Sequence, residues 1–378
     1  MPPSSTLSEI DTDLLTMCRV CHDQCLFATP EVLASGRQTH ATSRKALIVD
    51  QVRQGNFEWS PAAVAAIYSA LNSGVQHEFC VHFGFPGGWP DETDFIRAAR
   101  ANIVQAQRAP DYVNAALKTW QASGNPHGAR DLHESEDSNG NRPVLLYLDS
   151  ATRHWVPEQA EVCRSISHVL GGEVGLIGWG TSGFELFDLG LRDQARLSLD
   201  RLATRLGQAD LIVSDSPEAV WMLTDGAHRL GETRFSAAVD LLSWLVNQTE
   251  SRDDLRLAPT GDGSSLRNVA VTYQDPSYLG RYGAGNYDIP RMLIRETLGC
   301  ELREMRYSRA RAMPTGPYLG YPSANQALEI ARQRLSQAKA TGANVVLTAS
   351  PHDFHNLAQI ADAQMRVLYL SSLVKVTR

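Results

Sequence analysis

The sequence predicts a multidomain protein of mixed α+β and α/β class, in which a helical N-terminal region precedes two similar parallel α/β units. Two polar stretches rich in Gly, Pro, Asp and Ser, at residues 128–143 and 249–265, interrupt the chain of 378 residues. A chain of this length has room for two or three hydrophobic cores. We therefore expect three domains, which cover residues 1–128, 142–250 and 266–378.

The first part is expected to be mainly helical. Its segment SPAAVAAIYSALNS begins with Ser60 and Pro61, and a Ser followed by Pro is typical of the start of a helix.

The second and third parts resemble each other in their pattern of elements. Each begins with an apolar strand candidate, at residues 144–148 and 269–273, and each later has a strand that runs into Ser-Pro and a helix, at 209–223 and 343–357. Strands that alternate with helices indicate a parallel sheet. The two later segments align at one fixed offset, which pairs Ser216 with Ser350, Pro217 with Pro351 and Leu223 with Leu357.

The charge pattern excludes several kinds of partner. The net charge is −7, whereas nucleic acids and anionic membranes attract clustered Lys and Arg. No apolar run approaches the roughly 18 residues of a membrane-spanning helix, and the first residues lack the pattern of a signal peptide. We expect a cytoplasmic protein that binds no nucleic acid and is not integral to a membrane.

The cysteines point to a metal centre. Four of the six lie in the N-terminal stretch that ends at Cys80, and three of them, Cys18, Cys21 and Cys25, share one short segment. Such clustering in an intracellular chain favours metal binding over disulfides. An iron–sulfur cubane needs four thiolates, so a fourth cysteine must come from elsewhere.

Cys80 is the expected fourth ligand. Two-cluster ferredoxins have two cysteine runs, and the last cysteine of each run binds the other run's cluster. The first run here has Thr29 in place of its last cysteine, and the second run, ALNSGVQHEFC, retains only Cys80. The pattern predicts one [4Fe–4S] cluster on Cys18, Cys21, Cys25 and Cys80.

A structural zinc site is the alternative. It would use the same cysteines, or His22 or His77 in place of one of them, since closed zinc sites take these ligands. Cys163 and Cys300 stand alone in apolar patterns and are expected to be core residues.

With these motifs the chain resembles the iron–sulfur subunits of the heterodisulfide reductase, glycolate oxidase and anaerobic glycerol-3-phosphate dehydrogenase type. The clearest stretch is 273–305, which is similar to the family's second CCG domain around its H-D-P-C-Y-L-G-R motif. The resemblance implies a helical ferredoxin-like domain that carries the [4Fe–4S] cluster, followed by two CCG-like α/β domains.

The chain departs from this family at the CCG cysteines. The residues at those positions are Ser150, Thr181, Ser182, Ser216 and Ala219 in the first unit, and Ser277, Met313, Pro314, Ser350 and Asp353 in the second. Because these side chains do not replace thiolates at an iron–sulfur cluster, we expect no non-cubane cluster and no disulfide reduction.

The resemblance also implies a partner. Such subunits work beside flavin-containing dehydrogenases and pass electrons to a quinone, an electron-transferring flavoprotein or another subunit. Among them, the chain is most similar to those beside amine N-demethylating dehydrogenases. We expect an electron-transfer subunit without catalytic residues of its own; the alternative is a scaffold or docking subunit with a structural metal site.

Three further motifs have simpler interpretations. The G-x-G-x-x-G run at 178–183 is typical of a dinucleotide turn, but it follows the second strand of its unit, so a tight glycine turn is favoured. Ser216 and Ser350 are expected to cap helices rather than to act as nucleophiles. His352 and His355 lack a third ligand at a recognisable spacing and are expected at the surface or in packing.

Overall fold

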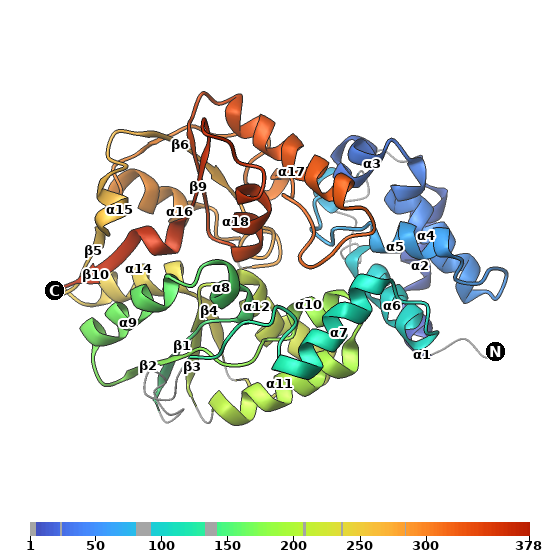
Figure 1. Ribbon diagram of the computed structural model, residues 1–378, viewed down its shortest axis with the longest axis horizontal. Helices are drawn as coiled ribbons and strands as arrows, with labels where there is room; N and C mark the ends of the chain where they lie inside the picture. Colours follow the sequence, from blue (N-terminus) through green and yellow to red (C-terminus); the bar gives the residue numbers. More distant parts are fainter. Residues whose placement is uncertain are drawn as a thin grey trace.

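The computed structural model confirms the mixed fold class, with helices at the N-terminal end and two parallel sheets. In Figure 1 the N-terminal helices lie on the right, and the two sheets lie one above the other on the left. The structure describes residues 5–22, 25–80, 92–132, 142–206, 209–235, 237–283 and 285–378.

The N-terminal region is a group of short helices, as expected. Helix α5 begins where the sequence indicates, because the Ser60 side chain accepts a hydrogen bond from the Ala63 N–H and Pro61 occupies the first turn. The α-helices are α1 (Ser5–Ser8), α2 (Thr12–Val20), α3 (Pro30–Ser35), α4 (Thr42–Arg53), α5 (Pro61–Tyr68), α6 (Glu92–Gln105) and α7 (Asp111–Ser123), and the 3-10 helices are η1 (Leu26–Ala28), η2 (Gln38–His40) and η3 (His77–Phe79).

The first sheet has four parallel strands in the order β2-β1-β3-β4. Alternate residues of β1 face opposite sides, because side chains alternate along a strand: Leu145 and Tyr147 join one core cluster, and Leu146 and Leu148 join another. The strands are β1 (Val144–Tyr147), β2 (Val174–Ile177), β3 (Leu211–Ser214) and β4 (Ala238–Asp240), and the helices are α8 (Ser150–Trp155), α9 (Gln159–Leu170), α10 (Phe184–Asp188), α11 (Arg192–Leu206), α12 (Pro217–Trp221), α13 (Ala227–Arg229) and α14 (Leu241–Ser251), with a π-turn η4 (Met222–Gly226).

The second sheet repeats the order of the first. Its parallel strands run β7-β6-β8-β9, so in both sheets the second strand lies at one edge and the first and third lie in the middle. The strands are β6 (Ala270–Gln274), β7 (Glu301–Leu302), β8 (Val345–Thr348) and β9 (Arg366–Tyr369); the helices are α15 (Gly261–Ser264), α16 (Asp288–Met292), α17 (Ala324–Lys339) and α18 (Pro351–Ala358), with η5 (Leu293–Thr297), η6 (Arg309–Arg311) and η7 (Leu370–Leu373).

A two-stranded antiparallel ribbon joins the two sheets. Strand β5 (Arg256–Pro259) lies in the segment expected to be a linker, and it pairs with β10 (Val374–Thr377). Val374 packs in the core of the second sheet and Val376 in a core of the first, while Leu257 contacts both. The ribbon therefore connects the two cores. The other expected linker, 128–143, lies largely outside the described residues.

The N-terminal helices and the first sheet share one core. A single cluster of buried apolar side chains includes Leu14 of α2, Phe95 of α6, Tyr147 of β1 and Trp221 of α12. The described helical region is therefore packed directly against the first unit.

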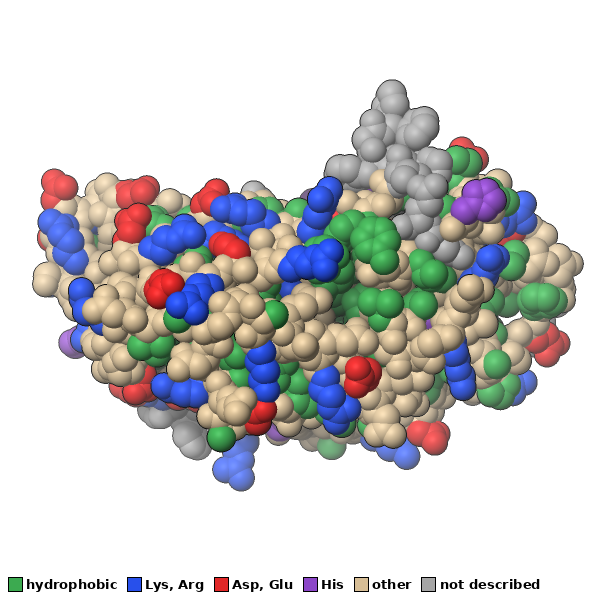
Figure 2. Space-filling model, turned by 90° about the horizontal axis from the view of Figure 1, so that it is seen from above, with side chains coloured by type: hydrophobic (Ala, Val, Ile, Leu, Met, Phe, Trp, Pro, Cys, Tyr) green, Lys and Arg blue, Asp and Glu red, His purple; other side chains and the backbone are tan. Residues whose placement is uncertain are grey.

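Positive and negative side chains are mixed on the surface of the described residues. Lys and Arg are interspersed with Asp and Glu on the face in Figure 2, and hydrophobic side chains gather in a hollow near its centre. Within the described residues, the helices are all too short or too polar to cross a bilayer.

Candidate metal centre

The predicted cysteine ligands sit at the ends of three short helices. Cys18 lies in the last turn of α2, Cys21 is the residue that ends this helix, and Cys25 precedes η1. Cys80 ends η3, where its N–H donates to the carbonyl of His77. The chain turns where a helix ends, so each of the four cysteines lies at or next to a turn.

These turns bring the four cysteines to one cavity. Its wall includes Leu14 and Met17 of α2, Thr42 and Ser43 of α4, Gln76, His77 and Glu92, together with Cys18, Cys21, Cys25 and Cys80. Each of the four thiols is partly exposed. Cys80 thus reaches the N-terminal loop although three α-helices, α3, α4 and α5, separate it from Cys25 in the sequence.

An ion-pair network fixes the cysteine-bearing helix on α4. Arg19 lies between Cys18 and Cys21, and its guanidinium is 2.7 Å from the carboxylate of Asp50, which is almost fully buried. Arg53 and Gln54 donate to the same carboxylate at 3.0 and 2.9 Å. Helix α2 packs along α4. The ion pair between Arg19 and Asp50 therefore helps to fix the position of Cys18.

The Cys18 thiol lies in a negative electrostatic environment. Burial raises the pKa of the Cys18 thiol well above its ordinary value, and Glu92, Cys25, Cys21 and Cys80 raise it further. Negative charges at these positions oppose one another, so four thiolates would need a positively charged centre between them.

Exposed apolar side chains lie near three of these cysteines in the sequence. Val20 and Phe27 are 63% and 52% exposed, and Met17, which lines the cavity, is exposed as well. Each lies within two positions of Cys18, Cys21 or Cys25. Exposed apolar side chains are found at binding surfaces for other proteins.

Several other predictions can be compared with the structure. Cys163 and Cys300 are buried core residues, as predicted. Ser216 and Ser350 cap α12 and α18 by accepting from the N–H groups of Ala219 and Asp353, which is also as predicted.

The glycine-rich turn at 178–183 is covered by the chain itself. The N–H of Gly180 donates to Asp131, and its carbonyl accepts from Arg153. The carbonyl of Gly178 accepts from the N–H of Leu132. Since these backbone groups already have partners, the turn has the geometry of a structural glycine turn, as the sequence favours.

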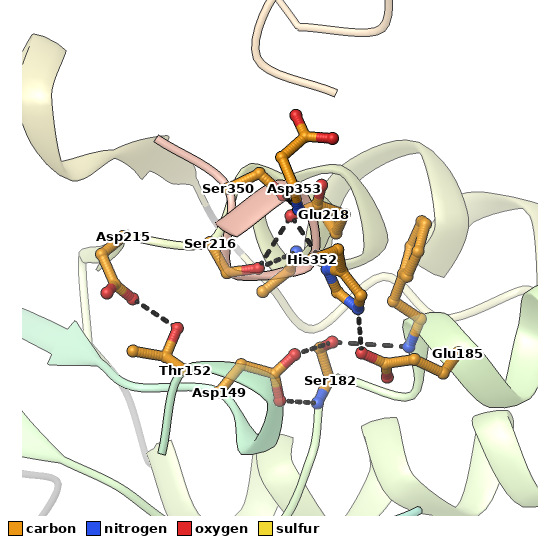
Figure 3. A network of polar contacts seen from close by, with 12 residues as sticks. Asp149, Thr152, Ser182, Glu185, Asp215, Ser216, Glu218, Ser350, His352 and Asp353 are labelled. Atoms are coloured by element: carbon orange, nitrogen blue, oxygen red, sulfur yellow. Dashed lines mark hydrogen bonds and ion pairs between the residues drawn. The ribbon is translucent and has the colours of Figure 1, made fainter. Parts of the chain in front are cut away.

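A buried polar network lies between the two sheets, where the resemblance places CCG cysteines (Figure 3). The Ser350 hydroxyl donates to Glu218 Oε1 at 2.7 Å, and the Ser216 hydroxyl donates to Glu218 Oε2 at 3.2 Å. Ser182 donates to Asp149 at 2.6 Å. The hydroxyls of Ser182, Ser216 and Ser350 thus hold buried carboxylates.

His352 is a buried packing residue rather than a surface residue, and it is also ion-paired. Its side chain is 1% exposed, and its Nε2 lies 2.9 Å from Glu185 Oε1. His127 Nε2 lies 3.1 Å from the same oxygen. Burial alone would lower the pKa of His352, but Glu218 and Glu185 outweigh it and raise this pKa to about 10. The carboxylate and the third ligand that the sequence lacked come from distant segments.

Asp215 makes stability depend on pH. Burial raises the pKa of its carboxyl to about 7, although Thr152 and Tyr369 donate hydrogen bonds to it. The folded state therefore holds a proton on Asp215 that the unfolded chain releases near pH 4. This carboxyl stabilises the fold fully below pH 4, and its contribution is lost as the pH rises to about 7.

We expect Asp215→Asn to remove this dependence, because an amide resembles the protonated carboxyl. The free energy of unfolding of Asp215→Asn minus that of the unaltered chain should rise by about 3 kcal/mol from pH 5 to pH 8. Urea titrations at both pH values measure it. Asp253→Asn, at an exposed position, is the control. An equal difference at pH 5 and pH 8 for Asp215→Asn would contradict the expectation.

Comparison with known proteins gives two partial similarities. No family model matches the chain. It is 37% identical over 111 residues to a probable membrane-anchored ferredoxin of Chromohalobacter salexigens, which covers 29% of this chain and 15% of that protein. It is 32% identical over 100 residues to the D subunit of the dihydromethanophenazine:CoB–CoM heterodisulfide reductase of Methanosarcina mazei, which covers 25% of this chain and 24% of that protein. The matches thus span about a sixth and a quarter of the relatives' lengths.

Proposed function

We propose that the chain is an iron–sulfur electron-transfer subunit that holds one [4Fe–4S] cluster on Cys18, Cys21, Cys25 and Cys80. The observation that carries the proposal is the convergence of these four cysteines, from two distant segments, on one cavity. The names of the two partial relatives, a ferredoxin and a heterodisulfide reductase subunit, support the same class of chemistry.

The donor set fits such a cluster. Iron–sulfur cubanes take four cysteine thiolates, and four cysteines line this cavity. When bound, the cluster supplies one-electron transfer at a potential that its surroundings set. The chain's part is to hold four thiols at helix ends, to fix α2 on α4 through Asp50, and to keep the site half-buried.

The partner in this proposal is a flavin-containing dehydrogenase, with an amine N-demethylating enzyme as the favoured type. The apolar side chains of Val20 and Phe27 beside the cysteines would form part of the docking surface. A partner that covers them would bring its flavin near the cluster and exclude water from it. The electrons would then pass to a quinone or an electron-transferring flavoprotein.

A test begins with the full chain purified without oxygen. We expect about four iron and four sulfide per chain, a visible thiolate-to-iron absorption that dithionite bleaches, and an EPR signal in the reduced state. A tagged chain isolated from its native cells should retain a flavin-containing subunit, and Val20→Glu with Phe27→Glu should weaken that association without loss of iron. Leu197→Glu, at an exposed apolar position on α11, is the matched control.

Two results would contradict the proposal. A colourless protein with one zinc per chain would favour the structural metal site and the scaffold alternative. A cluster-containing protein whose flavin partner binds equally well after the Val20 and Phe27 changes would place the docking surface elsewhere.

A further inference from the structure

A second group of metal-ligand side chains lies between the two sheets, away from the cysteine cavity. Its members are His127, Glu185 and His352, whose ligand atoms all lie within 4.8 Å of one another. Their side chains are 1%, 0% and 1% exposed. Two histidines and one carboxylate are the donor set of many zinc and iron(II) sites in proteins.

Each ligand is held by a distinct local structure. His127 follows α7 in a loop built around Asn125, whose side-chain oxygen accepts from the N–H groups of His127 and Ala129. Glu185 lies in the first turn of α10, directly after the left-handed Gly183. His352 lies in the first turn of α18, after the Ser350 cap.

The similarity of the two α/β units explains why Glu218 and His352 lie close together. The offset that aligns the two Ser-Pro motifs also pairs Glu218 with His352, so each follows Ser-Pro in the first turn of its helix. The two units face each other, and these equivalent positions meet: His352 Nδ1 lies 3.5 Å from Glu218 Oε2. In Figure 3 the side chains of Glu218 and His352 lie beside one another.

Glu218 has the position of a supporting residue. Metal-binding histidines usually direct their second ring nitrogen at a carboxylate, which fixes the ring and increases its basicity. Glu218 takes this place behind His352, and the hydroxyls of Ser216 and Ser350 hold its two oxygens. Nε2 of His352 is thereby directed at Glu185.

The three ligand atoms lie close enough to one another to share one ion. Ligands about 2.0–2.1 Å from a tetrahedral zinc ion lie roughly 3.3 Å apart. Oε1 of Glu185 is 3.1 Å from one imidazole nitrogen and 2.9 Å from the other. Oε2 of Glu185 is buried and has no hydrogen-bond partner within the described part of the chain.

The surroundings also favour a cation. In the described ion pairs, the partners of both buried glutamates are histidines, and neither glutamate has a lysine or an arginine. The ring of His154 stacks near His127, and that of His355 stacks on Trp155 beside His352. Four of the chain's eleven histidines gather here.

We propose that His127, Glu185 and His352 bind one divalent first-row transition-metal ion between the two α/β units, with Glu218 as a positioning residue. Zinc is used to test the site, because its bonds to nitrogen and oxygen are shorter than its bonds to sulfur. The bond lengths therefore distinguish binding at this site from binding at the cysteines. The site is independent of the cluster, since the two share no residue.

The test uses the full chain, stripped of loosely bound metal with a chelator and then titrated with zinc. We expect X-ray absorption at the zinc edge to show nitrogen and oxygen ligands at about 2.0–2.1 Å, whereas zinc on the cysteines would show sulfur at about 2.3 Å. His127→Gln should bind one zinc fewer per chain. Glu218→Gln should keep the stoichiometry but bind about 10–100-fold more weakly.

Controls separate loss of binding from loss of folding. His168→Gln, on the exposed side of α9, should bind zinc like the unaltered chain. Circular dichroism of each metal-free variant checks the fold. The X-ray absorption measurement on the unaltered protein identifies the ligands without any substitution, so a folding defect in a variant cannot affect it. Zinc seen with sulfur ligands alone, or an unchanged stoichiometry in a folded His127→Gln, would overturn the proposal.

Discussion

Replacement of Cys80 by alanine is expected to lower the iron content from about four per chain to below one. Cys80 supplies one of four proposed thiolate ligands, and the other three cannot complete a cubane alone. Alanine is chosen because its side chain has no ligand atom. We expect the visible absorption and the reduced-state EPR signal to disappear together.

The matched control for this change is Cys300→Ala. Cys300 is a buried core residue of the second sheet whose thiol contacts the carbonyl of Leu266, far from the cavity. This variant should keep its iron and its spectra. A full iron content in Cys80→Ala, or an equal loss in both variants, would show that residue 80 is not a ligand.

Replacement of Asp188 by asparagine is expected to cost about 3–5 kcal/mol of folding free energy. Asp188 is the buried carboxylate at the end of α10, and its Oδ2 lies 2.7 Å from Arg100. Its Oδ1 lies 3.7 Å from Arg97 and accepts a hydrogen bond from Asn72. The change would leave two buried guanidinium groups without this carboxylate, and a buried charge without its counter-charge is strongly destabilising.

The main-chain geometry leaves little room for relaxation at this point. Gly190 has a φ of +87°, and a Cβ atom there would overlap the carbonyl carbon of Arg100. Helices α6 and α10 are therefore in close contact beside the ion pair. The backbone of Arg100 is thus held against the turn that follows α10.

Chemical denaturation of the full chain measures this effect. Asp193→Asn, at an exposed position in the first turn of α11, is the control and should change the free energy by less than about 0.5 kcal/mol. If Asp188→Asn stays within about 1 kcal/mol of the unaltered chain, the carboxylate is not the main counter-charge for the two arginines.

The sequence predicts the regular parts of the fold because their signals are local. The strands before Ser216 and Ser350 are short apolar runs, and the serines cap the next helices through contacts within a single turn. A repeat in such local signals is visible at a fixed offset. The parallel order of both sheets follows from that alternation.

Contacts between distant segments are where sequence reasoning is weakest. The pairing of β5 with β10, and the core that joins the N-terminal helices to the first sheet, depend on how whole elements pack. The cysteine set was predicted because three thiols share one loop and a ferredoxin pattern supplies the fourth. Its role as a ligand set stays a prediction.

The histidine–glutamate site gives no spacing signal, since its three ligands come from separate elements. One clue was present in the sequence. The offset that pairs the two Ser-Pro motifs also pairs Glu218 with His352, and opposite charges at equivalent positions of facing units are placed to meet.

The ribbon of β5 and β10 limits how the α/β halves can be dissected or exchanged. A fragment cut near residue 265 would leave Arg256–Pro259 with an open edge and would remove Val376 from the interior of the other half. Expression of either half alone should give insoluble material. An exchanged half would have to supply a strand that pairs with the strand of the half that is kept.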